Sequence, residues 1–175
     1  RSTPLYSSAA SDVYKRQADN FGAAYAKSQL AAGNRLPDSG TAFISVNDDD
    51  KQNVVPIARD LAELGFHLIA SCGTAAYLRA NGLEVEVVYK INEGRPHVGD
   101  RLLDRDVQLI VNTPLGRESF FDDMAMRRIA MLYGVPCVTT LTGATATVSA
   151  IRSLRSDEKS VRPLQDYHAD VLGRR

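Results

Sequence analysis

Residues 107–111 read VQLIV, an almost unbroken apolar run in the second half of the chain. Such a run is typical of a strand that is buried on both faces of a parallel sheet. A parallel sheet needs a crossover between successive strands, and that crossover is usually a helix. The pentapeptide therefore predicts an α/β fold, in which short strands and helices alternate on either side of it.

Four further runs have the composition of short strands: residues 42–46 (AFISV), 66–70 (FHLIA), 84–88 (EVEVV) and 136–139 (PCVT). Apolar residues recur at helical spacing between them, from Val54 to Leu64, Gly73 to Ala80, Phe121 to Leu132 and Gly143 to Leu154. Residues 90–99 lack any periodicity and are expected to form a loop. Five strands joined by helical crossovers predict an open five-stranded parallel sheet flanked by helices, a Rossmann-like three-layer sandwich.

The beginning of the chain does not fit this pattern. Residues 1–17 are rich in Ser and Ala, start with Arg1 and show no helical or strand period, so we interpret them as a non-native leader. Residues 19–30 have apolar positions on one helical face and are followed by the turn-forming stretch 33–40. We expect residues 18–38 to be the end of a preceding unit and a linker, and residues 39–175 to form the main domain.

Composition excludes several classes of function. The 175 residues contain 21 basic and 21 acidic side chains, and this balance does not favour binding to a nucleic-acid backbone. No apolar stretch is long enough for a membrane span, which predicts a cytoplasmic protein with no membrane partner. Cys72 and Cys137 are far apart and form no CxxC pair, so we expect two buried, reduced thiols and no metal site.

Ligands of open parallel sheets bind beyond the carboxyl ends of the strands. At that edge, residues 71–74 (SCGT) place a glycine and two hydroxyls at a helix start, where backbone N–H groups favour a phosphate. Lys51 and Lys90 follow two other strands and supply positive charge. The same SCGT stretch is also an ordinary helix cap, and residues 48–50 (DDD) are typical of a solvated turn.

Together these loops resemble the methylglyoxal-synthase-like domain that ends the large subunit of carbamoyl-phosphate synthase. The resemblance is carried by residues 43–46 (FISV), Lys51, Gly73-Thr74, Lys90, 93–97 (EGRPH), 110–113 (IVNT), Arg127-Arg128 and 139–143 (TTLTG). It includes the helix at residues 19–30, which is similar to the end of the preceding synthetase unit in that subunit.

The resemblance implies a regulatory domain that binds a nucleotide such as UMP or IMP and contains no catalytic residue and no metal. Its phosphate would be held by Lys51, Ser71, Gly73 and Thr74, with Ser45, Lys90, Asn112 and Thr113 completing the pocket. Thr139 corresponds to a residue of an activator site, where ornithine binds in some members. In that site Cys137 replaces a tyrosine, so ornithine activation is left open.

The resemblance also implies partners and cofactors. The partners would be the rest of the large subunit, the glutaminase small subunit and other copies in an oligomer. No cofactor is expected in this chain, whereas the parent enzyme would use ATP with Mg²⁺ or Mn²⁺ to make carbamoyl phosphate from bicarbonate and glutamine-derived ammonia.

Three alternatives share the predicted fold. Methylglyoxal synthase acts on dihydroxyacetone phosphate and needs a carboxylate base, but Thr113 stands where that enzyme family has the base. A cyclohydrolase portion of a purine enzyme fits the EGRPH run at residues 93–97 poorly. A domain that serves only in subunit contacts is the remaining alternative, and Lys90 would then be a solvated loop residue.

Overall fold

The computed structural model describes residues 21–115 and 117–156, with the backbone alone at residues 117–122. The predicted leader at residues 1–17 and the last part of the predicted domain lie outside the described residues. No helix in the described part of the chain is long and apolar enough to cross a membrane.

Five parallel strands form one sheet, as the sequence predicts, and their order is β3-β2-β1-β4-β5. The strands are β1 (Thr41–Val46), β2 (His67–Ala70), β3 (Glu86–Val87), β4 (Leu109–Thr113) and β5 (Cys137–Val138). The central strand β1 is paired on both sides, with β2 and β4. The strand β4 begins two residues later than the predicted strand at residues 107–111, and Gln108 just before it bonds to the backbone of Thr41 through both its side chain and its own N–H.

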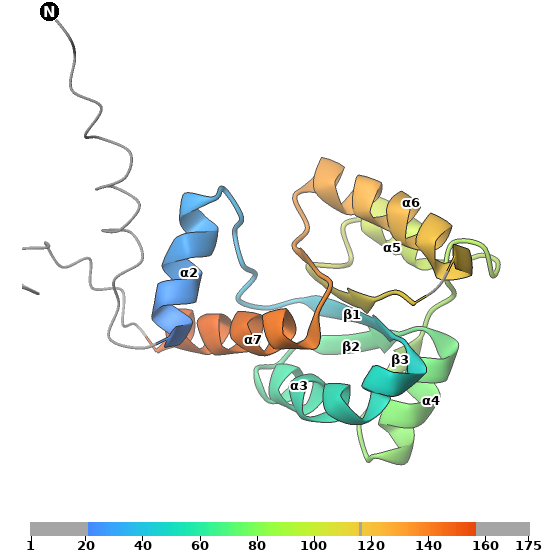
Figure 1. Ribbon diagram of the computed structural model, residues 1–175, viewed down its shortest axis with the longest axis horizontal. Coiled ribbons are helices and arrows are strands. Elements are labelled where there is room, and N and C mark those ends of the chain that lie inside the picture. The colour runs from blue at the N-terminus through green and yellow to red at the C-terminus, as the bar shows by residue number, and fades with distance from the viewer. Residues whose placement is uncertain (1–20, 116, 157–175) are drawn as a thin grey trace, which may run out of the picture.

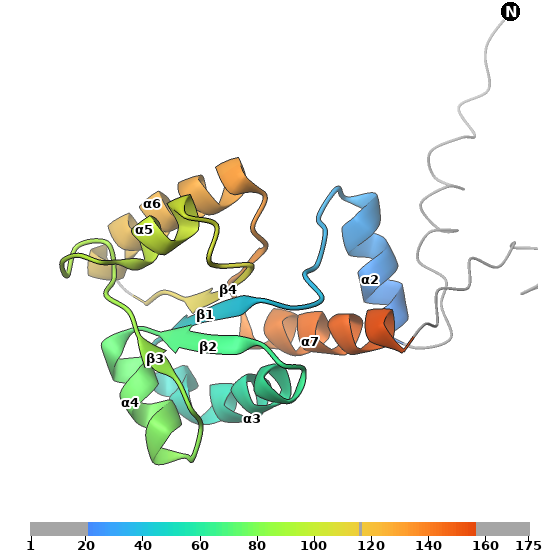
Figure 2. The same cartoon turned by 180° about the vertical axis from the view of Figure 1, so that it is seen from behind.

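Helices cover both faces of the sheet (Figures 1 and 2). One face carries α3 (Lys51–Glu63), α4 (Cys72–Ala80) and α7 (Leu141–Arg155), and the other carries α5 (Val98–Leu103) and α6 (Arg117–Tyr133). A short 3₁₀ turn, η1 (Asp48–Asp50), joins β1 to α3. The sheet and its two helical layers confirm the three-layer sandwich.

The helix α5 was not predicted, since residues 90–99 were expected to form a loop throughout. It begins at Val98 and is capped by His97, whose Nδ1 accepts a hydrogen bond from the backbone N–H of Asp100 at 3.1 Å. The carboxylate of Asp100 accepts from the N–H of His97 in return. A helix of six residues is too short to show a 3.6-residue period, which is why the sequence pattern missed it.

The alternation of side chains along the strands decides which residues face each helical layer. In β1, Ala42 and Ile44 pack towards α3, α4 and α7, whereas Phe43 packs towards α5 and α6. The next residue on the α5–α6 side is Ser45, and its register partner in β4 is Asn112. Two polar side chains therefore end the apolar face of the sheet at its carboxyl edge.

The first described helix, α2 (Phe21–Ala31), packs on α7 (Figure 1). The contact is close at Gly22, where a Cβ atom would lie 2.5 Å from the backbone oxygen of Ser149. The helix that the sequence places in a preceding unit thus lies directly against a helix of the sheet domain. The boundary itself stays a prediction.

Because β4 is buried, shortening one of its side chains should strongly lower the stability of the protein. Leu109 is fully buried, and we expect Leu109→Ala to lower the free energy of unfolding by about 2–5 kcal/mol because it leaves a cavity. Leu132→Ala, at a side chain that is 78% exposed, is the matched control and should change it by less than about 0.5 kcal/mol. Equal effects in urea denaturation would contradict the described packing.

Candidate functional site

The first turn of α4 lies at the carboxyl end of β2, and Cys72 and Gly73 in it are exposed. The side chain of its N-cap residue, Ser71, accepts no hydrogen bond from the backbone of the helix, whereas the N-cap side chains of α5 and α7 do. The first N–H groups of a helix have no partner within the helix, so an uncapped first turn leaves backbone donors for another acceptor. These donors and the helix dipole favour an anion.

Lys51 brings a positive charge to this turn. It begins α3, and its ammonium nitrogen lies 3.4 Å from the position that a Cβ atom would take at Gly73. Because Gly73 lacks a side chain, the ammonium reaches the backbone of the turn. The structure thus brings together three of the predicted phosphate-binding residues: Lys51, Ser71 and Gly73.

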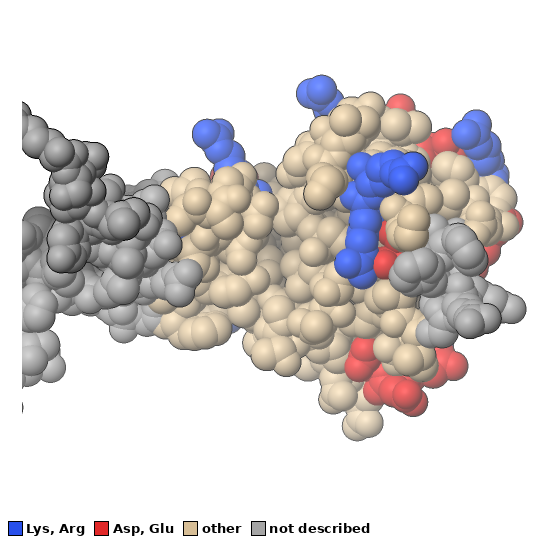
Figure 3. Space-filling model, turned by 45° about the horizontal axis from the view of Figure 1, so that its top comes forward, with Lys and Arg blue, Asp and Glu red and all other residues tan. Residues whose placement is uncertain are grey.

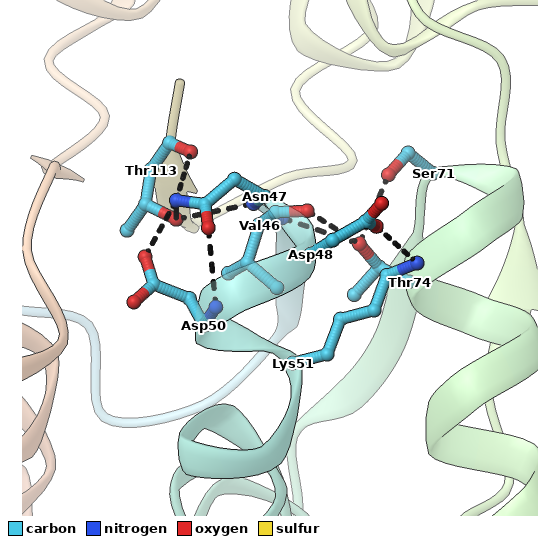
Figure 4. Close-up of polar contacts among 8 residues, drawn as sticks. All are labelled: Val46, Asn47, Asp48, Asp50, Lys51, Ser71, Thr74 and Thr113. Carbon is cyan, nitrogen blue, oxygen red and sulfur yellow. Dashed lines mark hydrogen bonds and ion pairs between the residues drawn. The ribbon is translucent and has the colours of Figure 1, made fainter. Parts of the chain in front are cut away.

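The hydroxyl of Thr74, another predicted phosphate-binding residue, makes its hydrogen bonds within the protein. It is buried, accepts hydrogen bonds from the Val46 N–H and the Ser71 hydroxyl, both at 3.2 Å, and donates to the Val46 carbonyl at 3.4 Å (Figure 4). Thr74 therefore joins the start of α4 to the end of β1. Its role in holding a phosphate stays a prediction.

Cys72 lies in the same turn and is exposed, so the prediction of a buried thiol is wrong at this position. The reason is its place at the first residue of α4, where Thr74 and Ala75 are the residues that face the core. Cys137 is partly buried, and burial raises the pKa of its thiol to about 11. Both thiols are free.

Asp48 forms an ion pair with Lys51 across the 3₁₀ turn, with 2.6 Å between its Oδ1 and the ammonium nitrogen. The Asp48 side chain is 91% exposed and that of Lys51 is 23% exposed. The hydrogen bond and charge of Lys51 lower the pKa of the Asp48 carboxyl group below its ordinary value. Sequence reasoning treated residues 48–50 as a solvated turn and missed this pair, although the i,i+3 spacing is the available signal.

Thr113 braces β4 to the end of β1. Its hydroxyl accepts hydrogen bonds from the backbone N–H of Asn47 at 3.4 Å and from the Asn47 side-chain amide at 3.3 Å. The same amide donates to the carboxylate of Asp50 at 2.8 Å (Figure 4). This predicted site residue is 7% exposed and holds the loop that carries Lys51.

The other three predicted pocket residues, Ser45, Lys90 and Asn112, line one cavity between the sheet, α5 and α6. Its volume is about 20 Å³, which is room for roughly one water molecule. The remaining lining residues are Phe43, Ile91, Val98, Asp123 and Met126. A nucleobase would enter this cavity only after the surrounding segments move apart.

Asp123 is a residue of this cavity that sequence reasoning missed. It is 4% exposed, accepts a hydrogen bond from the Asn112 side-chain amide at 2.7 Å and pairs with Arg127 at 2.7 Å. The hydrogen bond from Arg127 to Asp123 in turn raises the pKa of the arginine. An Asp and an Arg four residues apart on a predicted helix were visible in the sequence, but their connection to Asn112 depends on the packing of α6.

Thr139 lies apart from these residues, in a groove of about 540 Å³ between α2, α6, β5 and α7. Cys137 and Arg127 line the same groove. In the part of the chain that the structure describes, no group of three His, Cys, Asp or Glu side chains could hold a metal ion. On the face seen in Figure 3, basic side chains lie at separate places and form no continuous basic surface.

Comparison with known proteins identifies the family of the chain. The family model for the MGS-like domain matches residues 53–139. The carbamoyl phosphate synthase large chain of Acidobacterium capsulatum is 47% identical over 152 residues, which are 87% of this chain and 14% of that protein. The large chain of Pseudomonas putida is 48% identical over 153 residues, with the same two shares. The chain thus spans about a seventh of the length of the curated relatives it matches.

Among solved structures, methylglyoxal synthase from Elizabethkingia anophelis NUHP1 has a similar fold, with a TM-score of 0.54 and 18% sequence identity. The similarity covers 66% of this chain and 80% of the synthase, and at this identity it shows the fold alone. The family model and the two large chains identify the same family. The chain therefore belongs to the MGS-like domain family, in the form that carbamoyl phosphate synthase large chains carry.

Proposed function

We propose that this chain is the regulatory domain of a carbamoyl phosphate synthase large chain and that it binds a nucleotide effector such as UMP or IMP by its phosphate. In the proposal the parent enzyme makes carbamoyl phosphate from bicarbonate, ATP and glutamine-derived ammonia in the cytoplasm, for pyrimidine and arginine synthesis. The partners of the chain are then the rest of the large subunit and the glutaminase small subunit.

One observation carries the proposal: the uncapped first turn of α4 lies against the ammonium of Lys51. Backbone N–H donors, a helix dipole and a point charge converge there on one place at the sheet's carboxyl edge, which is where parallel sheets bind ligands. A phosphate can accept from all of these donors at once. The supporting charge is local, in keeping with a net charge of zero for the whole chain.

The rest of the nucleotide would extend towards Ser45, Lys90 and Asn112. These residues line the small cavity at the same edge, and Asp123 fixes the side-chain amide of Asn112 by accepting one of its hydrogen bonds. That bond leaves the amide oxygen of Asn112 and the ammonium of Lys90 as the groups that contact the ligand. Binding then requires the cavity to open, because its present volume holds roughly one water molecule.

An effector can regulate the parent enzyme only through a difference in affinity between two conformations. The opening of the small cavity is the difference that we propose. A nucleotide that binds the open form better shifts the population towards it, and α5 and α6, which cover the cavity, would transmit the change.

The geometry does not favour the lyase alternative. Methylglyoxal formation needs a carboxylate base, and the residue that the resemblance places at the base position is Thr113. Thr113 is 7% exposed, and its hydroxyl accepts two hydrogen bonds from Asn47. A buried hydroxyl that braces two strands is suited to structure, and we propose binding without chemistry.

Removal of the Lys51 charge tests the proposal. Because a hydrogen bond to a charged group contributes about 1.5–3 kcal/mol, Lys51→Met should weaken UMP binding by about tenfold or more in calorimetric titration. Arg59→Met, which removes a positive charge from the exposed side of the same helix, is the control and should leave the affinity within about twofold. Unchanged UMP affinity in Lys51→Met, or no binding of UMP or IMP by the unmodified chain, would contradict the proposal.

The exposed thiol in the first turn of α4 provides a second test. Iodoacetamide at pH 8 should modify Cys72, and saturating UMP should slow this reaction several-fold because the phosphate covers the turn. Cys137 should react far more slowly, since a thiol with a pKa of about 11 is mostly protonated at that pH. Uridine without phosphate is the control and should not protect Cys72. The labelling of each cysteine is followed by mass spectrometry. Equal rates of Cys72 labelling with and without UMP would show that UMP does not bind at this turn.

A further inference from the structure

The three consecutive aspartates after β1 have different environments. Asp50 accepts a hydrogen bond from the Asn47 side chain and belongs to the brace between β1 and β4. Asp49 has an exposed side chain. Asp48 alone of the three pairs with Lys51, the cation of the candidate phosphate site. A purely solvated acidic turn would not distinguish its members in this way.

The Asp48 carboxylate lies where an anion would bind. Its Oδ1 is 2.6 Å from the Lys51 ammonium, which itself lies 3.4 Å from the Cβ position of Gly73. Figure 4 shows the carboxylate and the ammonium pointing towards each other on the side of the loop that faces α4. In the ligand-free chain, Asp48 thus gives Lys51 the negative partner that a bound phosphate would otherwise supply.

The same carboxylate is free to leave. Its side chain is 91% exposed, so no core packing resists a change of rotamer. An exposed ion pair of this kind is weak, because both groups can return to water when they separate. A ligand with a stronger interaction with Lys51 can therefore displace Asp48 without disturbing the fold.

We propose that Asp48 is an internal competitor for the phosphate and thereby determines the charge selectivity of the site. This inference rests on the proposed function. A ligand must replace the singly charged carboxylate on Lys51, and a phosphate monoester near neutral pH carries a charge of about −1.5 to −2. Carboxylate ligands gain nothing in the exchange, whereas a phosphate dianion also accepts from the uncapped turn of α4.

The competitor role makes a prediction opposite in sign to a positioning role. If Asp48 competes, its neutralisation strengthens binding of a phosphate ligand, since nothing has to be displaced and a nearby repulsive charge is removed. If Asp48 instead orients Lys51 for the ligand, the same substitution weakens binding. The sign of the effect separates the two roles.

The test compares Asp48→Asn with Asp49→Asn, which makes the same change of net charge one residue away. UMP is titrated into each purified variant and into the unmodified chain at constant ionic strength, with and without excess acetate. We expect Asp48→Asn to bind UMP about two- to fivefold more tightly, in line with the strength of exposed ion pairs. Asp49→Asn should show a clearly smaller gain. Acetate should weaken UMP binding in Asp48→Asn more than in the unmodified chain, because the carboxylate position on Lys51 is then vacant.

A double variant supplies the remaining control. In a Lys51→Met background, Asp48→Asn should no longer tighten UMP binding by this margin, since the pair that it breaks is already absent. UMP binding by the unmodified chain together with equal or weaker binding by Asp48→Asn would overturn the inference and leave the proposed function standing. Absence of UMP binding in the unmodified chain and in Asp48→Asn alike would overturn both.

Discussion

The hydrogen bonds that tie the end of β1 to its neighbours on both sides hold the candidate site in place. On one side, the Thr74 hydroxyl bonds to both the N–H and the carbonyl of Val46. On the other side, the Thr113 hydroxyl and carbonyl accept from Asn47. The end of β1 is thereby fixed relative to α4 and to β4. The 3₁₀ turn and the helix α3 that follow it begin with Asp48 and Lys51, so the position of these charged groups depends on the two threonines.

These hydrogen bonds distinguish residues that hold the site together from residues that are exposed at it, a difference that a sequence motif does not record. Thr74 and Thr113 are buried and use their hydroxyls within the protein, whereas Lys51 pairs with the exposed Asp48, and Gly73 in the first turn of α4 is exposed. A sequence motif records only that these positions hold certain residue types. The structure shows which of these residues make their hydrogen bonds within the protein, and we propose that the others contact the ligand.

Much of the fold could be predicted because buried parallel strands leave continuous apolar runs and their crossover helices leave a 3.6-residue period. The carboxyl edge followed from topology, and so did the grouping of Lys51, Ser71 and Gly73. The helix α5 was missed because its six residues are set by the capping of His97 and Asp100 and not by periodicity. The role of Asp123 was missed because its contact with Asn112 joins a helix to a strand. The exposure of Cys72 depends on the orientation of a single helical turn.

The central claim is that the first turn of α4 binds a phosphate, and amide chemical shifts from two-dimensional ¹H–¹⁵N NMR test it most directly. On titration with UMP, the account predicts saturable shifts of the backbone N–H signals of Cys72 and Gly73, which have no side-chain cap. The N–H of Gly143 is the internal reference, because it donates to the Thr140 side chain at the start of α7 and should shift little. Saturable shifts confined to Gly143 and the groove around Thr139, with Cys72 and Gly73 unmoved, would contradict the account.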